Sequence, residues 1–528
     1  MLSFRPVCRL SAVLTPFLLL AAAAAHAATY YVSTTGADKN AGTSLTSPFA
    51  TLQYAITAAN EGDTVFVLSG TYKGKGNRNL DFAGTNLTLA VYPKSDGTPG
   101  SVTLDVYDNG NDERAFLFQT GETSNTVIDG FKIINGSEPY DSGGAVYIVG
   151  SSPTFTNCTF DSNNAHLAGA VFVYNYAAPT FTNCTFTNNS SFYGGATYMD
   201  YKTQASFSAC TFSTNSGAYG GAVYTYASSD SYTDCTFDSN SAYVGGALYT
   251  TSNAAPTFTN ATFSNNAAID RGGASFAGYK GSVTLYNGVV FGNSALSGGG
   301  FYNSYKSASN LYNTTVTGNS ATSKGGAIYN GTFCSPTIFA SILWNDKAGA
   351  GGNEIFNASA TSVPTVTNTD IQGGWAKSGT NQNVAPLFMG AQDFHLQAAS
   401  PLIDKGTIYG ATISDKGANP RVANSVTDLG ASELSTPTIT DDSYSVVHNT
   451  MLAMNATSGV LANDSANKGG LLSAVLVSRP SVGTLNLNTD GSFAYKPADG
   501  YLGTIVFTYQ AKNSKGLSAI ATVYLTVR

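Results

Sequence analysis

Apolar and small residues recur along residues 143–345 in two alternating phrases. The first phrase is Gly-Gly-Ala followed by an aliphatic residue or Thr and then by Tyr, and it is found at 143–147, 194–198, 220–224, 245–249 and 325–329. The second is Phe-x-x-Asn, and its later copies carry Val or Ile in place of Phe, the last of them at Ile342/Asn345. Successive copies lie 25 to 27 residues apart. A fixed period of this length predicts stacked structural repeats.

The composition of one repeat selects the architecture. Each repeat holds short runs rich in Thr, Phe, Tyr and Val, which favour strands, separated by Gly, Asn and Ser. One repeat is too small to bury its own core, so neighbouring repeats must stack. About 26 residues per turn suits a parallel β-helix, whereas a propeller blade needs about 40. The sequence therefore predicts an all-β fold: a single-stranded right-handed parallel β-helix of about 12 coils, followed by a small antiparallel β-sandwich.

Stacking turns each repeated position into a column of side chains. The Phe positions from Phe160 to Phe263 are predicted to form a buried aromatic stack. The cysteines two residues before four of them should also point inward, because side chains of a strand alternate between its faces. Stacked Cβ atoms lie about 4.8 Å apart, longer than the roughly 3.8 Å of a disulfide, so we expect buried free thiols. These cysteines are Cys158, Cys184, Cys210 and Cys235.

Two sets of asparagines are expected to be structural. The first set stands at predicted sharp turns, where Asn tolerates a positive φ, and the second belongs to the Phe-x-x-Asn phrase. Stacked Asn side chains can hydrogen-bond from coil to coil. The first set comprises Asn157, Asn183 and Asn260, and the second comprises Asn163, Asn189, Asn215, Asn240 and Asn266.

The chain divides into four predicted segments. Residues 1–27 have the charged start, apolar run and small-residue cleavage site of a secretory signal. Residues 28–378 are predicted to form the β-helix with an N-terminal cap, including a helix that begins at Ser47-Pro48. Residues 379–434 should close the β-helix, and residues 435–528 should form the sandwich.

Composition and charge narrow the possible partners. Only 11% of the 528 residues are charged and the formal net charge is −7, so nucleic acid is not an expected partner. After the signal, no apolar run is long enough to span a bilayer. The four His residues are scattered, and neither a metal cluster nor a cofactor site is predicted.

Tyrosines and a few charges gather around the Gly-Gly-Ala strands and form a candidate ligand-binding strip. Tyrosine rings can pack against the apolar faces of sugars and still offer a hydroxyl group. A solvated flank rich in Tyr for its β propensity is the competing interpretation. Neither the paired acids of a glycoside hydrolase nor an Arg-rich lyase motif is recognisable, so no catalytic residue is predicted. The strip comprises Tyr174, Tyr176, Asp200, Tyr201, Lys202, Tyr226, Asp270, Arg271, Tyr279 and Tyr305.

The two repeated phrases resemble the repeats of polymorphic outer membrane proteins, a family of surface adhesins whose passenger domains are β-helices of the pectate-lyase-like class. The start of the mature chain is similar to the N-terminal cap of secreted β-helix polysaccharide lyases. Residues 383–433 resemble the choice-of-anchor segment of secreted bacterial proteins. The last domain is similar to bacterial Ig-like and cadherin-like repeats, some of which bind calcium. The corresponding loop here is Ser-Ala-Asn-Lys-Gly, with no second acid, so no metal site is predicted there.

These observations lead to one functional hypothesis and two alternatives. We predict a secreted or cell-surface protein with an adhesin-like or carbohydrate-binding role, whose partner is an extracellular polysaccharide or a host or cell-surface glycan. The first alternative is a polysaccharide lyase acting on an acidic polysaccharide. The second is a passive structural spacer.

Overall fold

The computed structural model describes residues 27–107, 113–375, 379–397, 399–407, 415–416, 427–434, 436–467, 471–513 and 516–528. Residues 1–26 of the predicted signal lie outside these ranges, as do residues 408–414 and 417–426 of the predicted closing segment.

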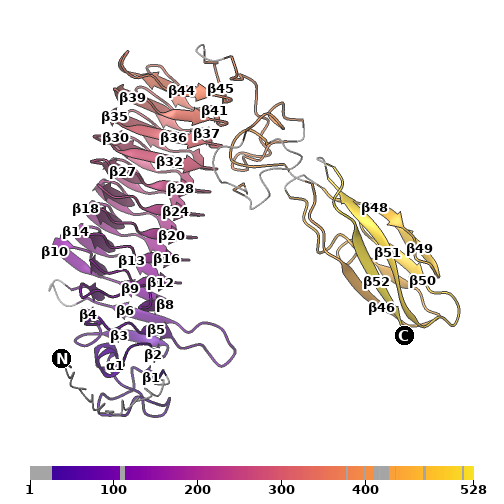
Figure 1. Ribbon diagram of the computed structural model, residues 1–528, viewed down its shortest axis with the longest axis horizontal. Helices are drawn as coiled ribbons and strands as arrows, with labels where there is room; N and C mark the ends of the chain where they lie inside the picture. The colour runs from indigo at the N-terminus through magenta and orange to yellow at the C-terminus, as the bar shows by residue number, and fades with distance from the viewer. Residues whose placement is uncertain are drawn as a thin grey trace, which may run out of the picture.

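Four parallel sheets, here named A to D, run side by side along a rod of stacked coils, about 12 in number (Figure 1). Sheet A contains β1 (Thr29–Val32), β2 (Thr64–Val67), β5 (Thr88–Val91), β8 (Val127–Asp129), β12 (Thr154–Thr156), β16 (Thr180–Thr182), β20 (Ser206–Ser208), β24 (Ser231–Thr233), β28 (Thr257–Thr259), β32 (Ser282–Tyr286), β36 (Ala308–Tyr312), β40 (Thr337–Phe339) and β44 (Thr365–Thr367). Sheet B contains β3 (Gly70–Lys73), β6 (Val102–Asp105), β9 (Phe131–Ile134), β13 (Thr159–Asp161), β17 (Thr185–Thr187), β21 (Thr211–Ser213), β25 (Thr236–Asp238), β29 (Thr262–Ser264), β33 (Val289–Phe291), β37 (Thr315–Thr317), β41 (Ile342–Trp344) and β45 (Asp370–Ile371).

The other two sheets complete each coil, which passes from A to B to D to C. Sheet C contains β4 (Leu80–Asp81), β7 (Phe116–Phe118), β11 (Val146–Val149), β15 (Val171–Tyr174), β19 (Thr197–Asp200), β23 (Val223–Tyr226), β27 (Leu248–Thr251), β31 (Ser275–Ala277), β35 (Phe301–Tyr305), β39 (Ile328–Thr332) and β43 (Ile355–Asn357). Sheet D contains β10 (Ser137–Ser142), β14 (Asn164–Leu167), β18 (Ser190–Tyr193), β22 (Ser216–Tyr219), β26 (Ser241–Val244), β30 (Ala267–Arg271), β34 (Ser294–Ala295), β38 (Ser320–Ala321) and β42 (Lys347–Ala348). The predicted β-helix is therefore confirmed.

Stacked phenyl rings fill the core, as predicted. Phe186 and Phe212 are both fully buried, and their parallel rings lie 4.6 Å apart. Sheet A adds a second aromatic column that the sequence analysis missed, in which Phe181 and Phe207 stack at 4.8 Å. Rings of the two columns meet edge to face, for example Phe186 and Phe207 at 6.1 Å. The four repeat cysteines are buried between these columns as free thiols, and Cys334 is also buried and free.

The two glycines of each Gly-Gly phrase have different roles. Gly194 has a φ of +67°, in the left-handed region that favours glycine. A Cβ atom on Gly195 would lie 2.0 Å from the carbonyl oxygen of Gly221 in the next coil. Neighbouring coils can therefore stack this closely at the Gly-Gly turn only because this position lacks a side chain.

The N-terminal end is covered by the one α-helix in the described residues, α1 (Leu52–Ala58), which buries Leu52, Ala55 and Ile56. The predicted helix start at Ser47-Pro48 is wrong, since Thr51 is the N-cap. Phe49 instead pairs with Val32 of β1, and its N–H donates to the carbonyl of Tyr31, so the chain is still extended there.

The coil that contains β41 departs from the predicted register by one residue. Leu343, and not Ile342, pairs with Val316, so Asp346 and not Asn345 takes the next asparagine position. The described parts of residues 379–407 and 427–434 then cover the outer face of β33, β37 and β41. There Leu396, Leu402 and Leu429 form a separate buried cluster with Ala340 and Ile342.

The C-terminal domain is a sandwich of two sheets (Figure 1). One sheet has the order β46 (Asp442–Val446), β52 (Ala521–Val527), β51 (Gly503–Lys512), β48 (Ser473–Ser478), and the other has the order β47 (Leu452–Met454), β50 (Phe493–Lys496), β49 (Thr484–Leu487). The pairing is antiparallel except between β46 and β52, which are parallel. Phe493, Phe507 and Tyr509 form its core.

Candidate functional site

The outer face of sheet C carries a continuous column of aromatic rings, here named the aromatic ladder. Strand alternation points Val171 and Val173 into the core and Phe172 outward. Neighbouring rings stack along the rod, at 4.7 Å between Tyr198 and Tyr224 and at 4.4 Å between Tyr302 and Tyr329. The ladder comprises Tyr147, Phe172, Tyr198, Tyr224, Tyr249, Phe276, Tyr302, Tyr329 and Phe356.

Each ring of the ladder stacks on its neighbours, so the ring faces are covered and are not open to a ligand. Tyr198 and Tyr224 are only 9% and 8% exposed, because Tyr193 and Tyr219 from the end of sheet D pack beside them. This column is not among the predicted site residues, although the fifth position of the Gly-Gly-Ala phrase marks it in the sequence.

Four tyrosines of the predicted strip lie together, where sheet C turns toward sheet A. Tyr174, Tyr176, Tyr201 and Tyr226 are all exposed, Tyr176 most strongly at 58%. The ring of Tyr201 lies 5.5 Å from that of Tyr176 and 6.0 Å from that of Tyr174. Tyr174 in turn packs on Phe172 at 6.3 Å, which joins this group to the aromatic ladder.

Lys202 is positioned among these rings. Its Nζ donates a hydrogen bond of 3.1 Å to the Tyr176 hydroxyl and lies 5.2 Å from the centre of the Tyr176 ring. This contact lowers the pKa of Tyr176 and raises the pKa of Lys202, so the lysine is charged at neutral pH. Asp200 is half buried at the end of β19, and burial raises its pKa.

The remaining residues of the predicted strip lie at two other locations, one with Tyr279 and Tyr305 and one with Asp270 and Arg271. Tyr279 and Tyr305 stack at 5.9 Å further along the same flank. Lys280 lies over the ring of Tyr279, and Lys306 lies over the ring of Tyr305. The coil between the two tyrosine groups carries Thr251 at the position of Tyr226.

Asp270 and Arg271 lie at the end of β30, on the opposite flank of sheet C from Lys202. There Arg271 Nε pairs with Asp270 at 3.1 Å, and its guanidinium covers the ring of Tyr302 at 5.5 Å. The structure therefore does not bring these two residues to the tyrosines after sheet C.

The asparagines of the Phe-x-x-Asn phrase form a closed internal network. Both the backbone N–H and the Nδ2 of Asn189 donate to Oδ1 of Asn215, each at 3.0 Å, and its Nδ2 also donates to the Phe160 carbonyl. The same pattern continues through the other members of the set, from Asn163 to Asn319. The amide groups of these buried asparagines are hydrogen-bonded to one another and to the backbone, so we do not expect them to bind a ligand.

The outer asparagine set stands at left-handed turns between sheets A and B. Asn157, Asn183 and Asn260 have φ values between +53° and +56°. Asn183 Nδ2 donates to Asn157 Oδ1 at 2.7 Å, and Asn260 Nδ2 donates to Asp234 at 2.9 Å.

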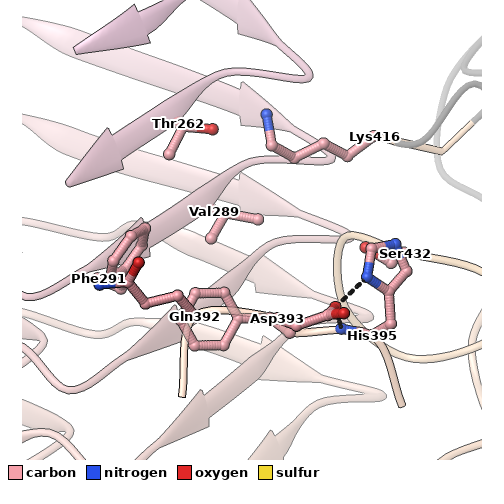
Figure 2. Close-up of a pocket in the computed structure, with 9 residues that line it drawn as sticks. Thr262, Val289, Phe291, Gln392, Asp393, His395, Lys416 and Ser432 are labelled. Carbon is pink, nitrogen blue, oxygen red and sulfur yellow. Dashed lines mark hydrogen bonds and ion pairs between the residues drawn. The ribbon is translucent and has the colours of Figure 1, made fainter. Parts of the chain in front are cut away.

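A cavity of about 470 Å³ lies between the closing segment and the outer face of sheet B (Figure 2). Asp393 bonds the Nδ1 of His395, and Ser432 lines the same cavity. His395 Nε2 is buried and has no hydrogen-bond partner within the described ranges, so the imidazole does not activate the Ser432 hydroxyl in this arrangement. Lys416 Nζ donates to the Asn260 carbonyl at 2.6 Å, and burial lowers the pKa of this lysine.

None of the described helices has the length and apolar character needed to cross a membrane. No group of three or more His, Cys, Asp or Glu side chains in the described ranges is arranged to hold a metal ion.

Family models match three parts of the chain. The model of the right-handed β-helix region matches residues 106–263 and 144–321, and that of the Chlamydia polymorphic membrane protein repeat matches residues 313–331. The bacterial cadherin-like domain matches residues 435–528. No curated protein matches this sequence.

Several solved structures are similar at low identity. A rhamnogalacturonan lyase has 15% identity and a TM-score of 0.42, with 69% of this chain and 91% of that chain covered. The pectate lyase Pel9A has 14% identity and a TM-score of 0.44, with 77% and 96% covered. XylC, solved with xylose, has 11% identity and a TM-score of 0.45, with 76% and 98% covered. The chain is thus a right-handed parallel β-helix protein with a polymorphic membrane protein repeat and a C-terminal bacterial cadherin-like domain.

Proposed function

We propose that this protein is exported or displayed at the cell surface and binds extended polysaccharides without cleaving them. The contact surface is the group of exposed tyrosines after sheet C, namely Tyr174, Tyr176, Tyr201 and Tyr226, here named the tyrosine strip. The observation that carries the proposal is the arrangement of these exposed rings on successive coils, with Tyr174 packed on Phe172 of the aromatic ladder.

The spacing of the coils suits a polymer. Successive coils are separated by about 4.8 Å, which is close to the length of one sugar residue, so neighbouring sugars can meet neighbouring coils. Aromatic rings pack against the apolar faces of sugars, while phenol hydroxyls offer hydrogen bonds. Because Tyr174 rests on Phe172 and Lys202 is bonded to Tyr176, less side-chain freedom is lost on binding.

Lys202 adds a preference for acidic polymers. Its ammonium group is exposed beside the rings, where it can pair with a carboxylate of a uronic acid. The half-buried Asp200 nearby limits how closely a second acidic group can approach.

The test is binding as a function of polymer length. Mature protein should bind polygalacturonate with an affinity that grows with chain length, because linked weak contacts raise the effective concentration. The double variant Tyr176→Ala/Tyr201→Ala should lose most of this binding, while Tyr524→Ala, which truncates an exposed tyrosine of the cadherin-like domain, should not. Unsaturated product released from the polymer would show a lyase instead, and binding to no glycan would favour a spacer.

A further inference from the structure

A second surface with ligand-binding character lies on the outer face of sheet D, where no predicted site residue except Asp270 and Arg271 is found. Two adjoining depressions of about 320 and 420 Å³ share Ser216 and Gly217, so they form one groove that runs across successive coils. We name it the sheet D groove. It spans β14, β18, β22, β26 and β30.

Strand register gives the groove one floor and two rims. The floor consists of small residues in register, Ala165, Ser191, Gly217, Ala242 and Ala268. The floor residues are small because sheet D packs closely against the Gly-Gly turns. A Cβ atom on Gly217, for example, would lie 2.7 Å from the Gly220 carbonyl oxygen. The polar rim consists of Asn164, Ser190, Ser216 and Ser241.

The other rim is apolar and largely exposed. Phe192, Tyr243 and Ile269 are 46%, 51% and 73% exposed, and the small Ala218 lies between the first two along this rim. The rings of His166 and Phe192 stack at 5.7 Å with an interplanar angle of 11°. Phe192 also contacts Tyr193 edge to face at 4.8 Å, so its position is fixed by packing.

The groove is uncharged. No Asp, Glu, Lys or Arg is among the described residues that line either depression. The nearest charges at its far end, Asp270 and Arg271, already pair with each other. A ligand with many carboxylates or sulfates would find no counter-charge here, whereas a hydroxylated neutral ligand would meet Ser and Asn side chains.

We infer that the sheet D groove binds a single extended chain of an uncharged polysaccharide. Sugar faces rest on the apolar rim, and sugar hydroxyls bond the polar rim. A polypeptide fits this groove less well. The backbone N–H and C=O groups of the strands that form the groove already pair along sheet D, so there is no open edge to which a peptide could add as a strand. The inference does not depend on the tyrosine strip, which lies on another face, beside the cationic Lys202.

The experiment compares the two surfaces on two kinds of polymer. Mature protein, Phe192→Ala/Tyr243→Ala and Tyr176→Ala/Tyr201→Ala are tested by affinity electrophoresis against hydroxyethyl cellulose and glucomannan, which are uncharged, and against polygalacturonate. The groove variant should bind the uncharged polymers about tenfold more weakly and polygalacturonate unchanged. The strip variant should retain the binding of uncharged polymers.

A second groove variant distinguishes a loss of binding from a loss of folding. Ser216→Glu places a charge where the two depressions meet, at an exposed position, and should also abolish binding of the uncharged polymers. The inference is overturned if the parent binds neither uncharged polymer, if both groove variants bind them like the parent, or if an extended neutral peptide competes for the groove. If only the strip variant loses polygalacturonate binding, the result bears on the proposed function of the tyrosine strip and not on the sheet D groove.

Discussion

Asp346 accepts both hydrogen bonds that Asn319 sends to the next coil, from its backbone N–H at 2.7 Å and from its Nδ2 at 2.8 Å. It therefore occupies the last rung of the internal asparagine column. Every earlier rung uses its Nδ2 to donate to a carbonyl of the preceding coil, as Asn319 does to Val290. A carboxylate has no such donor, and Oδ2 of Asp346 is buried without a partner in the described chain.

The first prediction is that Asp346→Asn stabilises the C-terminal coils at neutral pH. The amide restores the missing donor and removes a buried acid that stands beside Glu354. The expected gain is about 1–3 kcal/mol at pH 8, the range for satisfying a buried polar group. Hydrogen exchange of the last coils measures it, with Asp200→Asn as the control. A variant less stable than the parent at pH 8 would contradict this account.

The second prediction concerns the pH dependence of stability. Burial raises the pKa of Asp346 and Asp370 to about 6, and burial together with the Asp346 charge raises the pKa of Glu354. The folded state thus binds protons that the unfolded state has already released. The stabilising contribution of all three groups is full below about pH 4; that of the two aspartates is lost as the pH rises through about 6, and that of Glu354 as it rises through about 10. The C-terminal coils should exchange amide hydrogens less readily at pH 5 than at pH 8, after correction for intrinsic exchange rates. Asp346→Asn should reduce this difference, and an unchanged difference would assign it to other groups.

The third prediction is that Phe212→Ala costs about 3–5 kcal/mol, the range for truncating a core aromatic side chain. Phe212 stacks on Phe186 and Phe237 at 4.6 and 4.8 Å, so both adjoining coils lose a partner. The damage should stay near β21, because a solenoid couples mainly nearest neighbours. Hydrogen exchange should show it there and leave the sandwich unchanged. The exposed Phe192→Ala is the matched control, with a much smaller loss.

The fourth prediction concerns the thiols. Five of the six cysteines remain if the chain is cleaved after residue 27, and all five are buried and unpaired. They should resist a thiol reagent in the native protein, because they are at most 1% exposed. Titration in denaturant without reductant should give close to five thiols per chain. A count near one would mean that the column forms two disulfides.

The sequence was sufficient for the coil, its period and the inward Phe and Cys columns, because these depend on repeated apolar positions. It was not sufficient for the last rung, where Leu343 and Asp346 replace Phe and Asn and a neighbouring asparagine, Asn345, offered a better match to the phrase. Periodicity also does not say on which side of a short strand a residue falls. Asp270 precedes the Gly-Gly turn and Lys202 follows the strand, so they lie on opposite flanks of sheet C, which a strand of four residues keeps about 13 Å apart. The sheet D groove arises from side chains brought together by register, and its short strands carry no motif.

The last prediction separates the electrostatic from the aromatic contribution of the tyrosine strip. Lys202→Gln removes the ammonium group that lies over Tyr176 and Tyr201 but keeps a polar side chain of similar length. Binding of polygalacturonate should weaken by about three- to tenfold at low salt and converge on the parent value at high salt, since exposed charge pairs are screened. Binding of uncharged polymers should not change. Lys496→Gln, an exposed lysine of the sandwich, is the control for net charge. If both lysine variants lose the same affinity, the polymer responds to the overall charge of the protein and not to the strip.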